Sequence, residues 1–351
     1  MPGDILFSRE GAAGRVLLNR PQALNALTHD MIVELHAHLK VWATDESVKL
    51  VIIEGAGEKA FCAGGDIRAL YETRPGNEEY VIRFFADEYR LNMDIKSYPK
   101  PYVSIMDGIV MGGGVGVAVP GRRRIVTERT RCAMPETGIG LFPDVGGTYF
   151  LSRAPDNIGI YLGLTGERMN AANAIYAGFA DCVVSSESLP ELLATLCTHS
   201  YGADALAEID HLIEPYELDP GPASLKLLSA DVADLFSKDS MEQIIAGLEG
   251  PDTEWSKQTL TTLNQKSPTS LKVTLRAINL ARELNFDECM SQEYRIVLQI
   301  MKGNDIYEGT RALIIDKDGH PKWQPASLAQ ISDDFVDAHF KFLDELELTA
   351  S

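Results

Sequence analysis

Three consecutive glycines, Gly112 to Gly114, lie inside the apolar run from Ile109 to Val119. Because they have no β-carbon, they leave the backbone N–H groups uncovered, and they favour a turn that opens a helix. Free amides at such a turn form a site for an anion or for a developing oxyanion. The sequence therefore predicts a glycine turn that can present backbone amides to an anion.

Two carboxylates follow in a segment that is nearly free of other charge. Glu136 lies in Met134-Pro-Glu-Thr-Gly-Ile-Gly-Leu141, and Asp144 lies in Phe142-Pro-Asp-Val-Gly-Gly147. An oxyanion donor and two carboxylates are the components of an acyl-transfer site. Each feature also has a structural interpretation: Glu136 as a capping or surface residue, Asp144 as the N-cap of a helix from Val145 to Leu151, and the glycines as a packing turn.

A second glycine pair stands in Ala60-Phe-Cys-Ala-Gly-Gly-Asp-Ile67, before a predicted helix through Leu70 and Tyr71. Its backbone amides are a second set of potential donors, although Gly-Gly-Asp alone is common in loops. A further helix is predicted from Glu78 to Met93, and it contains Glu88. On composition alone, Glu88 is interpreted as a solvated helix carboxylate.

The charge of the chain narrows the classes of partner. Its 32 Lys and Arg against 51 Asp and Glu give a formal net charge of −19, which disfavours nucleic acid and anionic membranes. The basic turn Arg122-Arg-Arg124 could still reach a phosphate, but a solvated turn is the simpler interpretation.

The N-terminus has no basic segment followed by an apolar one, and no apolar stretch reaches about 18 residues. We therefore predict a cytoplasmic protein.

The cysteines are odd in number and widely spaced, and they form no metal-ligand pattern. We expect them to be reduced and buried. The seven histidines are scattered, and no G-x-G-x-x-G follows a strand, so we expect no metal site and no redox cofactor. The five cysteines are Cys62, Cys132, Cys182, Cys197 and Cys289.

Apolar periodicity predicts a repeated succession of strands and helices. The predicted strands are Asp4–Glu10, Arg15–Leu18, Leu50–Ile53, Tyr102–Met106 and Arg124–Thr127. Thr28 is predicted to cap a helix with one apolar face, and a short apolar helix is predicted from Gly113 to Val119. This order indicates an α/β fold of stacked ββα units and not a doubly wound sheet.

The remainder of the chain is predicted to be mainly helical. Residues 201–265 are acidic and contain four prolines, which predict short helices with broken connections, and a better amphipathic helix is expected from Ser270 to Leu284. From Asn304 to Pro325, glycine, proline and charged residues predict an ordered turn.

The motifs Phe61-Cys-Ala-Gly-Gly-Asp-Ile67, Met111-Gly-Gly-Gly-Val115 and Met134 to Gly147 occur together, and in this combination the chain resembles the crotonase (enoyl-CoA hydratase/isomerase) superfamily. Within it, the chain is most similar to the 3-hydroxyisobutyryl-CoA hydrolase branch. The resemblance covers about Asp4 to Val184 and returns from Glu308 to Pro325. It implies a crotonase-like spiral of stacked ββα units that carries an acyl-CoA site in residues 1–200. A helical C-terminal region with an acidic insert is then expected in residues 201–351.

The resemblance also implies roles for particular residues. The amides of Gly65 and Gly113 would form an oxyanion hole for the thioester oxygen, and each such donor is typically worth roughly 3 kcal/mol in the transition state. Glu136 would attack the thioester or activate a water molecule. Asp144 would hold the substrate hydroxyl or assist proton transfer, and Glu88 would match the acyl-pocket carboxylate of the family.

The assignment to the hydrolase branch depends on a glutamate that this chain lacks. Hydratases of the superfamily use two glutamates on one water, and the first of these positions is Gly116 here, while the second is Glu136. Addition of water to a double bond needs both an acid and a base, so we expect a poor hydratase. The pair Glu136 and Asp144 matches the hydrolase branch, which cleaves the CoA thioester of 3-hydroxyisobutyrate in valine catabolism.

Two alternatives remain at this point: an enoyl-CoA hydratase/isomerase-type lyase with a displaced acid, and a non-catalytic acyl-CoA-binding protein. Retention of Glu136 and Asp144 argues against the second, since binding alone needs neither carboxylate. No separate cofactor is expected, because CoA enters as part of the substrate. Assemblies vary within the superfamily, so the oligomeric state, including a homo-oligomer, stays open.

Overall fold

The computed structural model describes residues 3–72 and 78–348. Contacts within the chain group it into two units, each assembled from three separated segments. Unit 1 comprises Met1–Gly65, Arg90–Cys132 and Met169–Ser224, and unit 2 comprises Asp66–Tyr89, Ala133–Arg168 and Leu225–Ser351. The predicted division of the chain after residue 200 stays a prediction.

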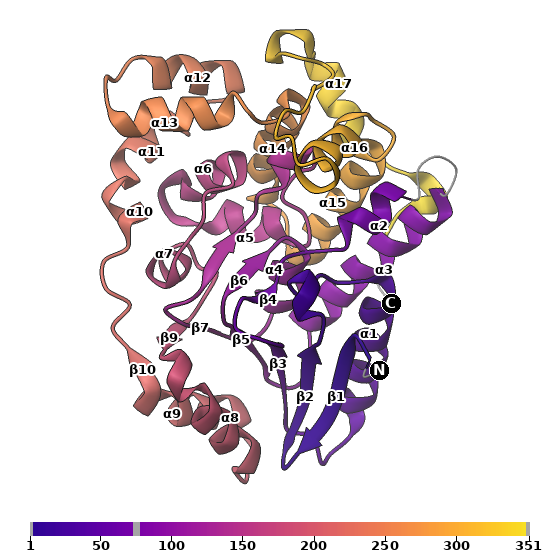
Figure 1. The fold of residues 1–351 in the computed structure, drawn as a ribbon, viewed down its shortest axis with the longest axis vertical. Coiled ribbons are helices and arrows are strands. Elements are labelled where there is room, and N and C mark those ends of the chain that lie inside the picture. The colour runs from indigo at the N-terminus through magenta and orange to yellow at the C-terminus, as the bar shows by residue number, and fades with distance from the viewer. Residues whose placement is uncertain (1–2, 73–77, 349–351) are drawn as a thin grey trace. The chain divides into compact units, whose positions relative to one another are not determined.

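Unit 1 contains a seven-stranded sheet in the order β1-β2-β3-β5-β7-β9-β10 (Figure 1). The strands are β1 (Ile5–Glu10), β2 (Ala13–Leu18), β3 (Leu50–Gly55), β5 (Tyr102–Met106), β7 (Arg123–Val126), β9 (Cys182–Val184) and β10 (Glu217–Leu218). β1 and β2, near the two strands predicted at the start of the chain, form an antiparallel hairpin, and β10 is antiparallel to β9. The strands from β2 to β9 run parallel, with Ile52 opposite Val103 and Ile105 opposite Ile125. Apolar strands at these central positions are typical of a parallel sheet that is covered by helices.

A second, three-stranded sheet has the order β4-β6-β8. Its strands are β4 (Ala60–Cys62), β6 (Ile109–Met111) and β8 (Arg131–Ala133). Along the chain, β3 is followed by β4 and helix α2 (Ile67–Glu72), and β5 is followed by β6 and helix α4 (Gly113–Ala118). Each turn thus gives one strand to each sheet and then a helix, which confirms the predicted succession of ββα units.

Helix α1 (His29–Thr44) begins and packs as the sequence predicts. The Thr28 side chain accepts a hydrogen bond from Met31 N at 3.2 Å and satisfies one free amide of the first turn. The predicted apolar face is buried, and it consists of Met31, Ile32, Leu35, Leu39 and Trp42.

The hydrophobic core of unit 1 joins the large sheet to helices α8 (Leu189–Thr198) and α9 (Ala205–Ile213). Leu192, Leu196 and Ile209 have no exposed surface and pack with Ile52 and Ile105 of the sheet. Full burial of a leucine or isoleucine contributes about 1.5–3 kcal/mol. Leu192→Ala would therefore leave a cavity and cost about 2–5 kcal/mol of stability.

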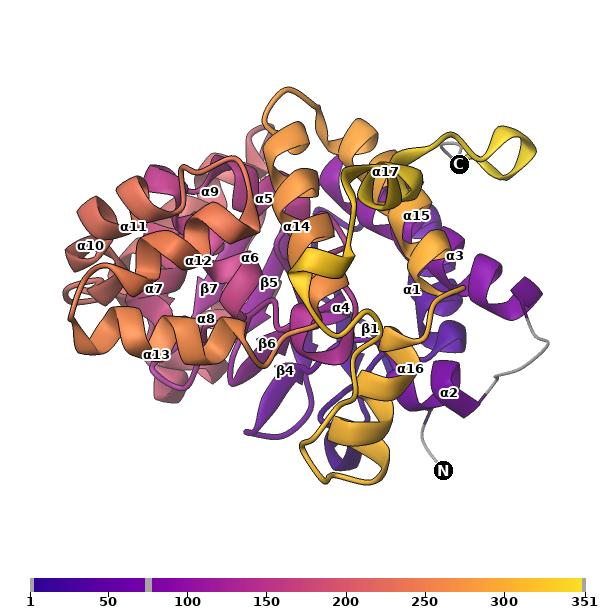
Figure 2. The ribbon, with the colours of Figure 1, turned by 90° about the horizontal axis from the view of Figure 1, so that it is seen from above.

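Unit 2 is mainly helical. Its helices include α5 (Gly147–Arg153), α6 (Ile158–Thr165), α11 (Ser229–Leu235), α12 (Met241–Glu249), α13 (Glu254–Leu263), α14 (Pro268–Ala281), α15 (Phe286–Ile300), α16 (Asp305–Thr310) and α17 (Asp333–Asp337). Every residue of α6 is buried, and α14 packs against both α5 and α6. Figures 1 and 2 both show α12 lying beside α13. These short helices between proline-rich connections confirm the prediction for residues 201–265.

The segment after α16 is ordered around one guanidinium group, as predicted for the tail. Arg311 forms ion pairs with Glu308 at 2.9 Å, Asp316 at 2.8 Å and Asp318 at 2.6 Å. Glu308 also accepts a 2.8 Å hydrogen bond from Lys322 N, which closes the turn. Because several charges share one network, this cluster contributes more than an isolated surface ion pair would.

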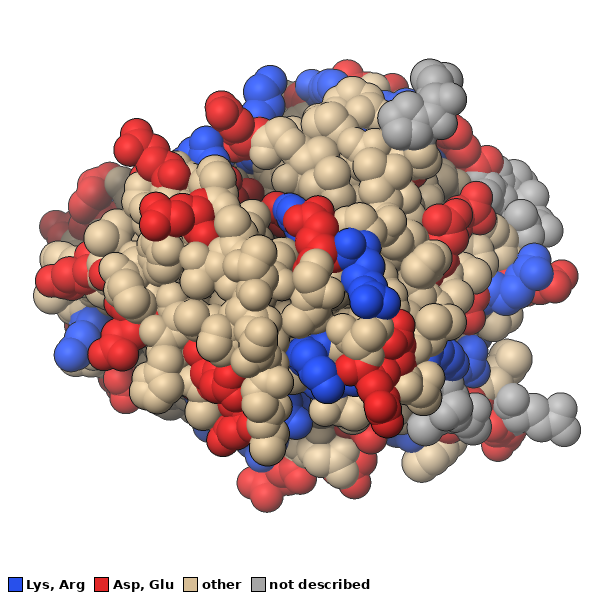
Figure 3. Space-filling model, turned by 90° about the horizontal axis from the view of Figure 1, so that it is seen from below, with Lys and Arg blue, Asp and Glu red and all other residues tan. Residues whose placement is uncertain are grey.

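On the face of the molecule drawn in Figure 3, acidic side chains are scattered among larger areas of uncharged residues, and the basic side chains shown there form no wide patch. This distribution accords with the net charge of −19. In the described ranges, no helix combines the length and the apolar character needed to cross a membrane.

Candidate active site

Unit 2 contains a group of buried carboxyl side chains. The exposed fractions are 2% for Glu88, 5% for Glu136, 4% for Asp144 and 0% for Glu293. Isolated buried carboxylates are costly, and clusters of them are characteristic of functional sites. The structure thus brings together the three carboxylates that the sequence singles out and adds a fourth, Glu293.

Glu136 opens a 3₁₀ turn, Glu136–Ile139, directly after β8 and Pro135. Gly140 ends this turn with φ of 79°, and Leu141 N donates to the Glu136 carbonyl at 3.0 Å. Thr137 Oγ1 donates to the Leu164 carbonyl of α6 at 3.0 Å. The backbone of Glu136 is therefore fixed on both sides, whereas Oε2 of its carboxyl is buried with no hydrogen-bond partner among the described residues.

The surroundings of Glu136 shift the pKa of its carboxyl in both directions. Burial raises the pKa of the Glu136 carboxyl well above its usual range, and the charge of Asp144 raises it further. Lys266 acts in the opposite direction and lowers the pKa of Glu136. The ammonium group lies against this turn, since a β-carbon on Gly138 would be 3.4 Å from Lys266 Nζ. Burial in turn lowers the pKa of Lys266 itself.

Asp144 lies in an unusual turn. Val145 has φ of 53° and Gly146 has φ of 84°, so two consecutive residues adopt the left-handed region. This conformation is strained for a β-branched residue such as valine. Gly147 N donates to the Asp144 carbonyl at 2.7 Å and closes the turn.

The Asp144 side chain faces helix α3 (Glu78–Lys96) and not α5. Tyr89 Oη donates a 2.7 Å hydrogen bond to Asp144 Oδ2. Burial raises the pKa of Asp144 to about 6, and the bond from Tyr89 offsets part of that rise. The interpretation of Asp144 as a helix cap is wrong, because α5 begins at Gly147 and Gly146 occupies the N-cap position without a side-chain cap.

Glu88 precedes Tyr89 in α3. Its side chain is almost completely buried, and Oε1 has no hydrogen-bond partner within the described part of the chain. Burial raises the pKa of the Glu88 carboxyl well above its usual range, and the Asp144 charge adds to this effect. The interpretation of Glu88 as a solvated helix carboxylate is therefore wrong.

The predicted oxyanion-hole glycines lie in unit 1. Gly113 is the first residue of α4, so its amide has no acceptor within the helix. Leu27 pairs with Gly65 in an isolated parallel bridge. In this bridge, Leu27 N donates to the Gly64 carbonyl at 2.9 Å, so the bond does not use the Gly65 amide. The two loops approach each other closely: a β-carbon on Gly64 would lie 3.8 Å from Gly113 N.

Glycine is required beside these amides. A β-carbon on Gly114 would lie 2.3 Å from the Cys62 carbonyl oxygen, and Gly112 has φ of 49°. Further along α4, the Gly116 carbonyl accepts a 2.9 Å hydrogen bond from Asn92 Nδ2. At the position where the hydratase pattern requires a glutamate, the structure thus holds a buried glycine whose carbonyl is bound to an amide.

The basic turn after α4 has its own partners. Arg123 pairs with Asp210, and Arg124 pairs with Asp181. Two of the three arginines are therefore held by carboxylates of unit 1 and are not free solvated cations.

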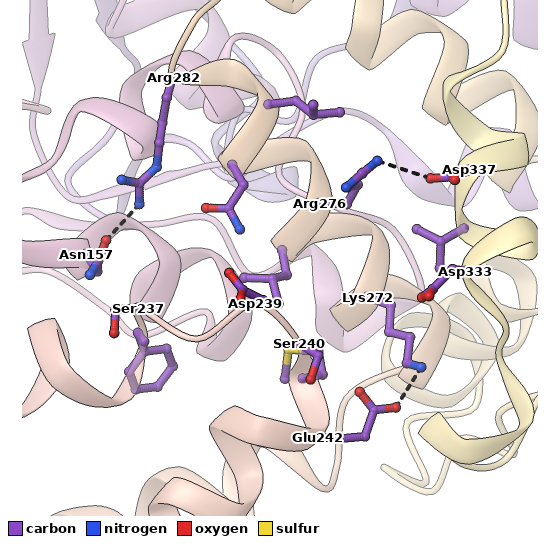
Figure 4. Close-up of a pocket in the computed structure, with 16 residues that line it drawn as sticks. Asn157, Ser237, Asp239, Ser240, Glu242, Lys272, Arg276, Arg282, Asp333 and Asp337 are labelled. Carbon is purple, nitrogen blue, oxygen red and sulfur yellow. Dashed lines mark hydrogen bonds and ion pairs between the residues drawn. The ribbon is translucent and has the colours of Figure 1, made fainter.

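A groove of about 810 Å³ in unit 2 lies along α14 and α17 (Figure 4). None of the predicted site residues lines it. Its cations already have partners: Lys272 pairs with Glu242 at 2.6 Å, Arg276 with Asp337 at 3.5 Å, and Arg282 donates to Asn157 Oδ1 at 2.7 Å. Figure 4 shows these pairs directed across the groove. Size alone therefore does not identify the site.

Sequence reasoning missed Glu293 and Lys266. Glu293 lies in α15 among buried residues such as Met290, Tyr294 and Val297. A glutamate on the apolar face of a predicted helix would have been the available signal. Lys266 lies in a polar loop between α13 and α14, and its sequence carries no comparable signal.

Comparison with known proteins identifies the class. A sequence profile of the enoyl-CoA hydratase/isomerase family matches residues 13–340. This chain belongs to that family, also called the crotonase superfamily. The resemblance stated from the sequence is therefore confirmed.

Several relatives carry one name. The protein called "3-hydroxyisobutyryl-CoA hydrolase, mitochondrial" in Danio rerio is 44% identical over 350 residues, which cover 98% of this chain and 91% of the relative. The protein of the same name in Homo sapiens is 40% identical over 349 residues, covering 98% of this chain and 90% of the relative.

Solved structures confirm the fold. A carnitinyl-CoA dehydratase from Mycobacterium thermoresistibile superposes with a TM-score of 0.93 at 40% identity and covers 99% of both chains. An enoyl-CoA hydratase from Rhodobacter sphaeroides 2.4.1 superposes with a TM-score of 0.91 at 38% identity, covering 99% of this chain and 100% of that one. The α/β crotonase-like fold with a helical C-terminal region is thus confirmed.

Proposed function

We propose that this protein is an acyl-CoA thioester hydrolase that acts on 3-hydroxyisobutyryl-CoA, as in valine catabolism. The observation that carries the proposal is the buried Glu136 together with Gly116 at the position of the first hydratase glutamate. The relatives from Danio rerio and Homo sapiens support it, because they match along nearly the whole chain and are named for this hydrolysis.

In the proposed first step, a carboxylate oxygen of Glu136 attacks the thioester carbon. The carbonyl electrons move to the oxygen, where the amides of Gly65 and Gly113 would stabilise the negative charge. Collapse of this intermediate breaks the carbon–sulfur bond and releases the CoA thiolate, which takes a proton. An anhydride between the acyl group and Glu136 remains.

In the second step, water attacks the anhydride, the acid is released and the Glu136 carboxylate is restored. Asp144, whose pKa is raised to about 6, would hold the substrate hydroxyl or transfer the proton. Activation of water by Glu136 would give the same products without an anhydride. A single turnover in oxygen-18 water separates the two routes, because only the anhydride route can leave label in the Glu136 carboxylate.

The alternative function is hydration or dehydration, for which two solved relatives are named. Addition of water to a carbon–carbon double bond needs an acid and a base, and Gly116 removes one of the two glutamates. The discriminating experiment follows free thiol release from a panel of acyl-CoA thioesters beside hydration of crotonyl-CoA. We expect thiol release with 3-hydroxyisobutyryl-CoA and slow hydration. Fast hydration without thiol release would overturn the proposal. Absence of both reactions would favour an acyl-CoA-binding protein.

We also propose that the protein acts in the cytoplasm, with no nucleic-acid or membrane partner. The net charge of −19 supports this part of the proposal. The animal relatives are named as mitochondrial, so fractionation of the native cell is the test. Light scattering during gel filtration would establish whether the protein is a homo-oligomer.

A further inference from the structure

Glu293 is a buried carboxylate that the proposed chemistry does not use. It lies in α15, has no exposed surface, and forms no ion pair with any described basic residue. Burial raises the pKa of Glu293 to about 8, and three hydrogen bonds offset part of that rise. The charge of Asp144 raises the pKa of Glu293. Glu293 in turn raises the pKa values of three neighbouring titratable groups, Glu136, Tyr89 and Cys289. A carboxyl in so unfavourable a place needs a specific explanation.

The hydrogen bonds of Glu293 all come from the turn after Asp144. Gly146 N donates to Oε2 at 2.7 Å, Thr148 N donates to Oε1 at 2.9 Å, and the Thr148 hydroxyl donates to Oε1 as well. These donors lie two and four positions after Asp144. They include amides at the start of α5, which has no side-chain cap of its own.

The turn needs such support. Val145 and Gly146 both have positive φ, and a strained conformation of this kind persists only where its surroundings hold it. Glu293 binds the backbone on the far side of Val145 from Asp144. The bonds to Glu293 therefore hold the backbone that directly follows Asp144 and Val145.

The other end of Asp144 is supported by the next residue of α15. Tyr89 donates to Asp144, and the Tyr89 ring contacts the Tyr294 ring edge-to-face at a centroid distance of 6.1 Å. Consecutive residues of one helix thus support the backbone after Asp144 and the donor to its carboxylate.

We propose that Glu293 is a positioning residue that holds the Asp144 carboxylate in the orientation used to recognise the substrate hydroxyl. This inference rests on the proposed function. Glu293 touches no reacting atom and acts through Asp144. A merely structural role, as a cap of α5, would lower stability without changing substrate preference.

The test is a double-mutant cycle with Glu293→Gln and Asp144→Asn, read as kcat/KM for 3-hydroxyisobutyryl-CoA and isobutyryl-CoA. Glutamine keeps the size of the side chain, but its NH2 group is a donor and would face an N–H group whose hydrogen bond the carboxylate accepts. We expect Glu293→Gln to lower kcat/KM for the hydroxylated substrate by roughly tenfold to a hundredfold, since small displacements of catalytic groups have effects of that size. The preference for that substrate should fall in parallel.

In the Asp144→Asn background, Glu293→Gln should have almost no further effect, because the group that it positions is already altered. The matched control is Asp287→Asn, which removes one negative charge from the exposed side of the same helix and should leave both values unchanged. An unchanged preference in Glu293→Gln, or an equal loss in both backgrounds, would overturn the proposal.

If Glu293→Gln does not fold, a second variant, Thr148→Val, still tests the proposal. Thr148→Val removes only the hydroxyl donor, and it should lower the substrate preference in the same direction by roughly twofold to fivefold, because two of the three hydrogen bonds to Glu293 remain. No change in the preference of folded Thr148→Val would count against the proposal.

Amide hydrogen exchange gives a readout that does not need turnover. Exchange at Gly146 and Thr148 should be faster in Glu293→Gln than in the wild type, and unchanged exchange would contradict the proposed support of the turn. If the wild type releases no thiol while exchange changes as expected, the proposed function fails and the support of the turn by Glu293 stands.

Discussion

Tyr89 Oη donates a 2.7 Å hydrogen bond to Asp144 Oδ2, and both side chains are buried. The bond joins a residue of α3 to a turn 55 positions further along the chain. It lowers the pKa of Asp144 against the larger effect of burial, which raises that pKa to about 6. The Tyr89 hydroxyl thus favours the ionised form of Asp144 and opposes the effect of burial.

Tyr89→Phe should raise the pKa of Asp144, because the donor that stabilises the carboxylate is lost. A hydrogen bond to a charged group is worth about 1.5–3 kcal/mol. A carbon-13 NMR titration of labelled aspartate, with Asp144→Asn for assignment, measures the change. Tyr294→Phe is the control, since it keeps the ring that contacts Tyr89 and removes a hydroxyl bound to the Ile82 carbonyl at 3.4 Å. An unchanged or lower pKa in Tyr89→Phe would contradict this assignment.

Glu136→Gln should change the pH dependence of stability. The pKa of Glu136 is raised in the folded protein, so the folded state binds the proton more tightly than the unfolded state. The stabilisation is fully present below the unfolded pKa of about 4.3, and it is lost as pH rises toward the folded pKa.

Urea unfolding from pH 4.5 to pH 8 tests this expectation. The free energy of unfolding should fall less with pH in Glu136→Gln than in the wild type, so that the variant gains relative stability at the alkaline end. Glu249→Gln, at an exposed position of α12, is the control. Parallel curves for the wild type and Glu136→Gln would mean that the pKa of Glu136 is not raised by folding.

Asp144→Asn should weaken discrimination between 3-hydroxyisobutyryl-CoA and isobutyryl-CoA. A site built to bond a hydroxyl rejects the analogue that lacks it, and we expect the ratio of the two kcat/KM values to fall by roughly tenfold or more. Steady-state thiol release with both substrates measures the ratio. An equal loss of kcat/KM with both substrates would contradict the hydroxyl-binding role of Asp144 and would support a role in proton transfer.

Gly113→Pro should abolish turnover in a folded protein, because proline has no amide hydrogen to donate. The structure makes this substitution feasible, since Gly113 is the first residue of α4 and proline is tolerated at the first helical position. Circular dichroism is the folding control. Gly114→Ala should instead destabilise the fold, because a β-carbon there would lie 2.3 Å from the Cys62 carbonyl oxygen. Normal turnover in a folded Gly113→Pro protein would mean that the Gly113 amide is not an oxyanion-hole donor.

The sequence predicts much of the fold because local signals and tertiary structure agree. Thr28 caps α1 as expected, and the apolar strands β3 and β5 are buried in a parallel sheet. The glycines of residues 112–114 also behave as their lack of side chains implies, since a β-carbon on Gly114 would collide with the neighbouring strand β4.

The failures arise where long-range contacts override local preferences. Asp144 precedes a helix and resembles a cap, but positive φ at Val145 moves the start of α5 and leaves the carboxylate facing Tyr89. Glu88 is polar in a helix, yet it is buried with Asp144 nearby. Glu293 binds Gly146 across 147 positions of sequence, a pairing that no local pattern contains.

The most direct test of the account is thiol release from 3-hydroxyisobutyryl-CoA by the wild type and by Glu136→Gln, measured side by side with CoA affinity. Glutamine keeps the size and hydrogen bonding of the side chain and removes the attacking charge. We expect kcat to fall by roughly two or more powers of ten with CoA affinity nearly unchanged. Near-normal thiol release by Glu136→Gln would contradict the central claim and move the chemistry to Asp144 or Glu88.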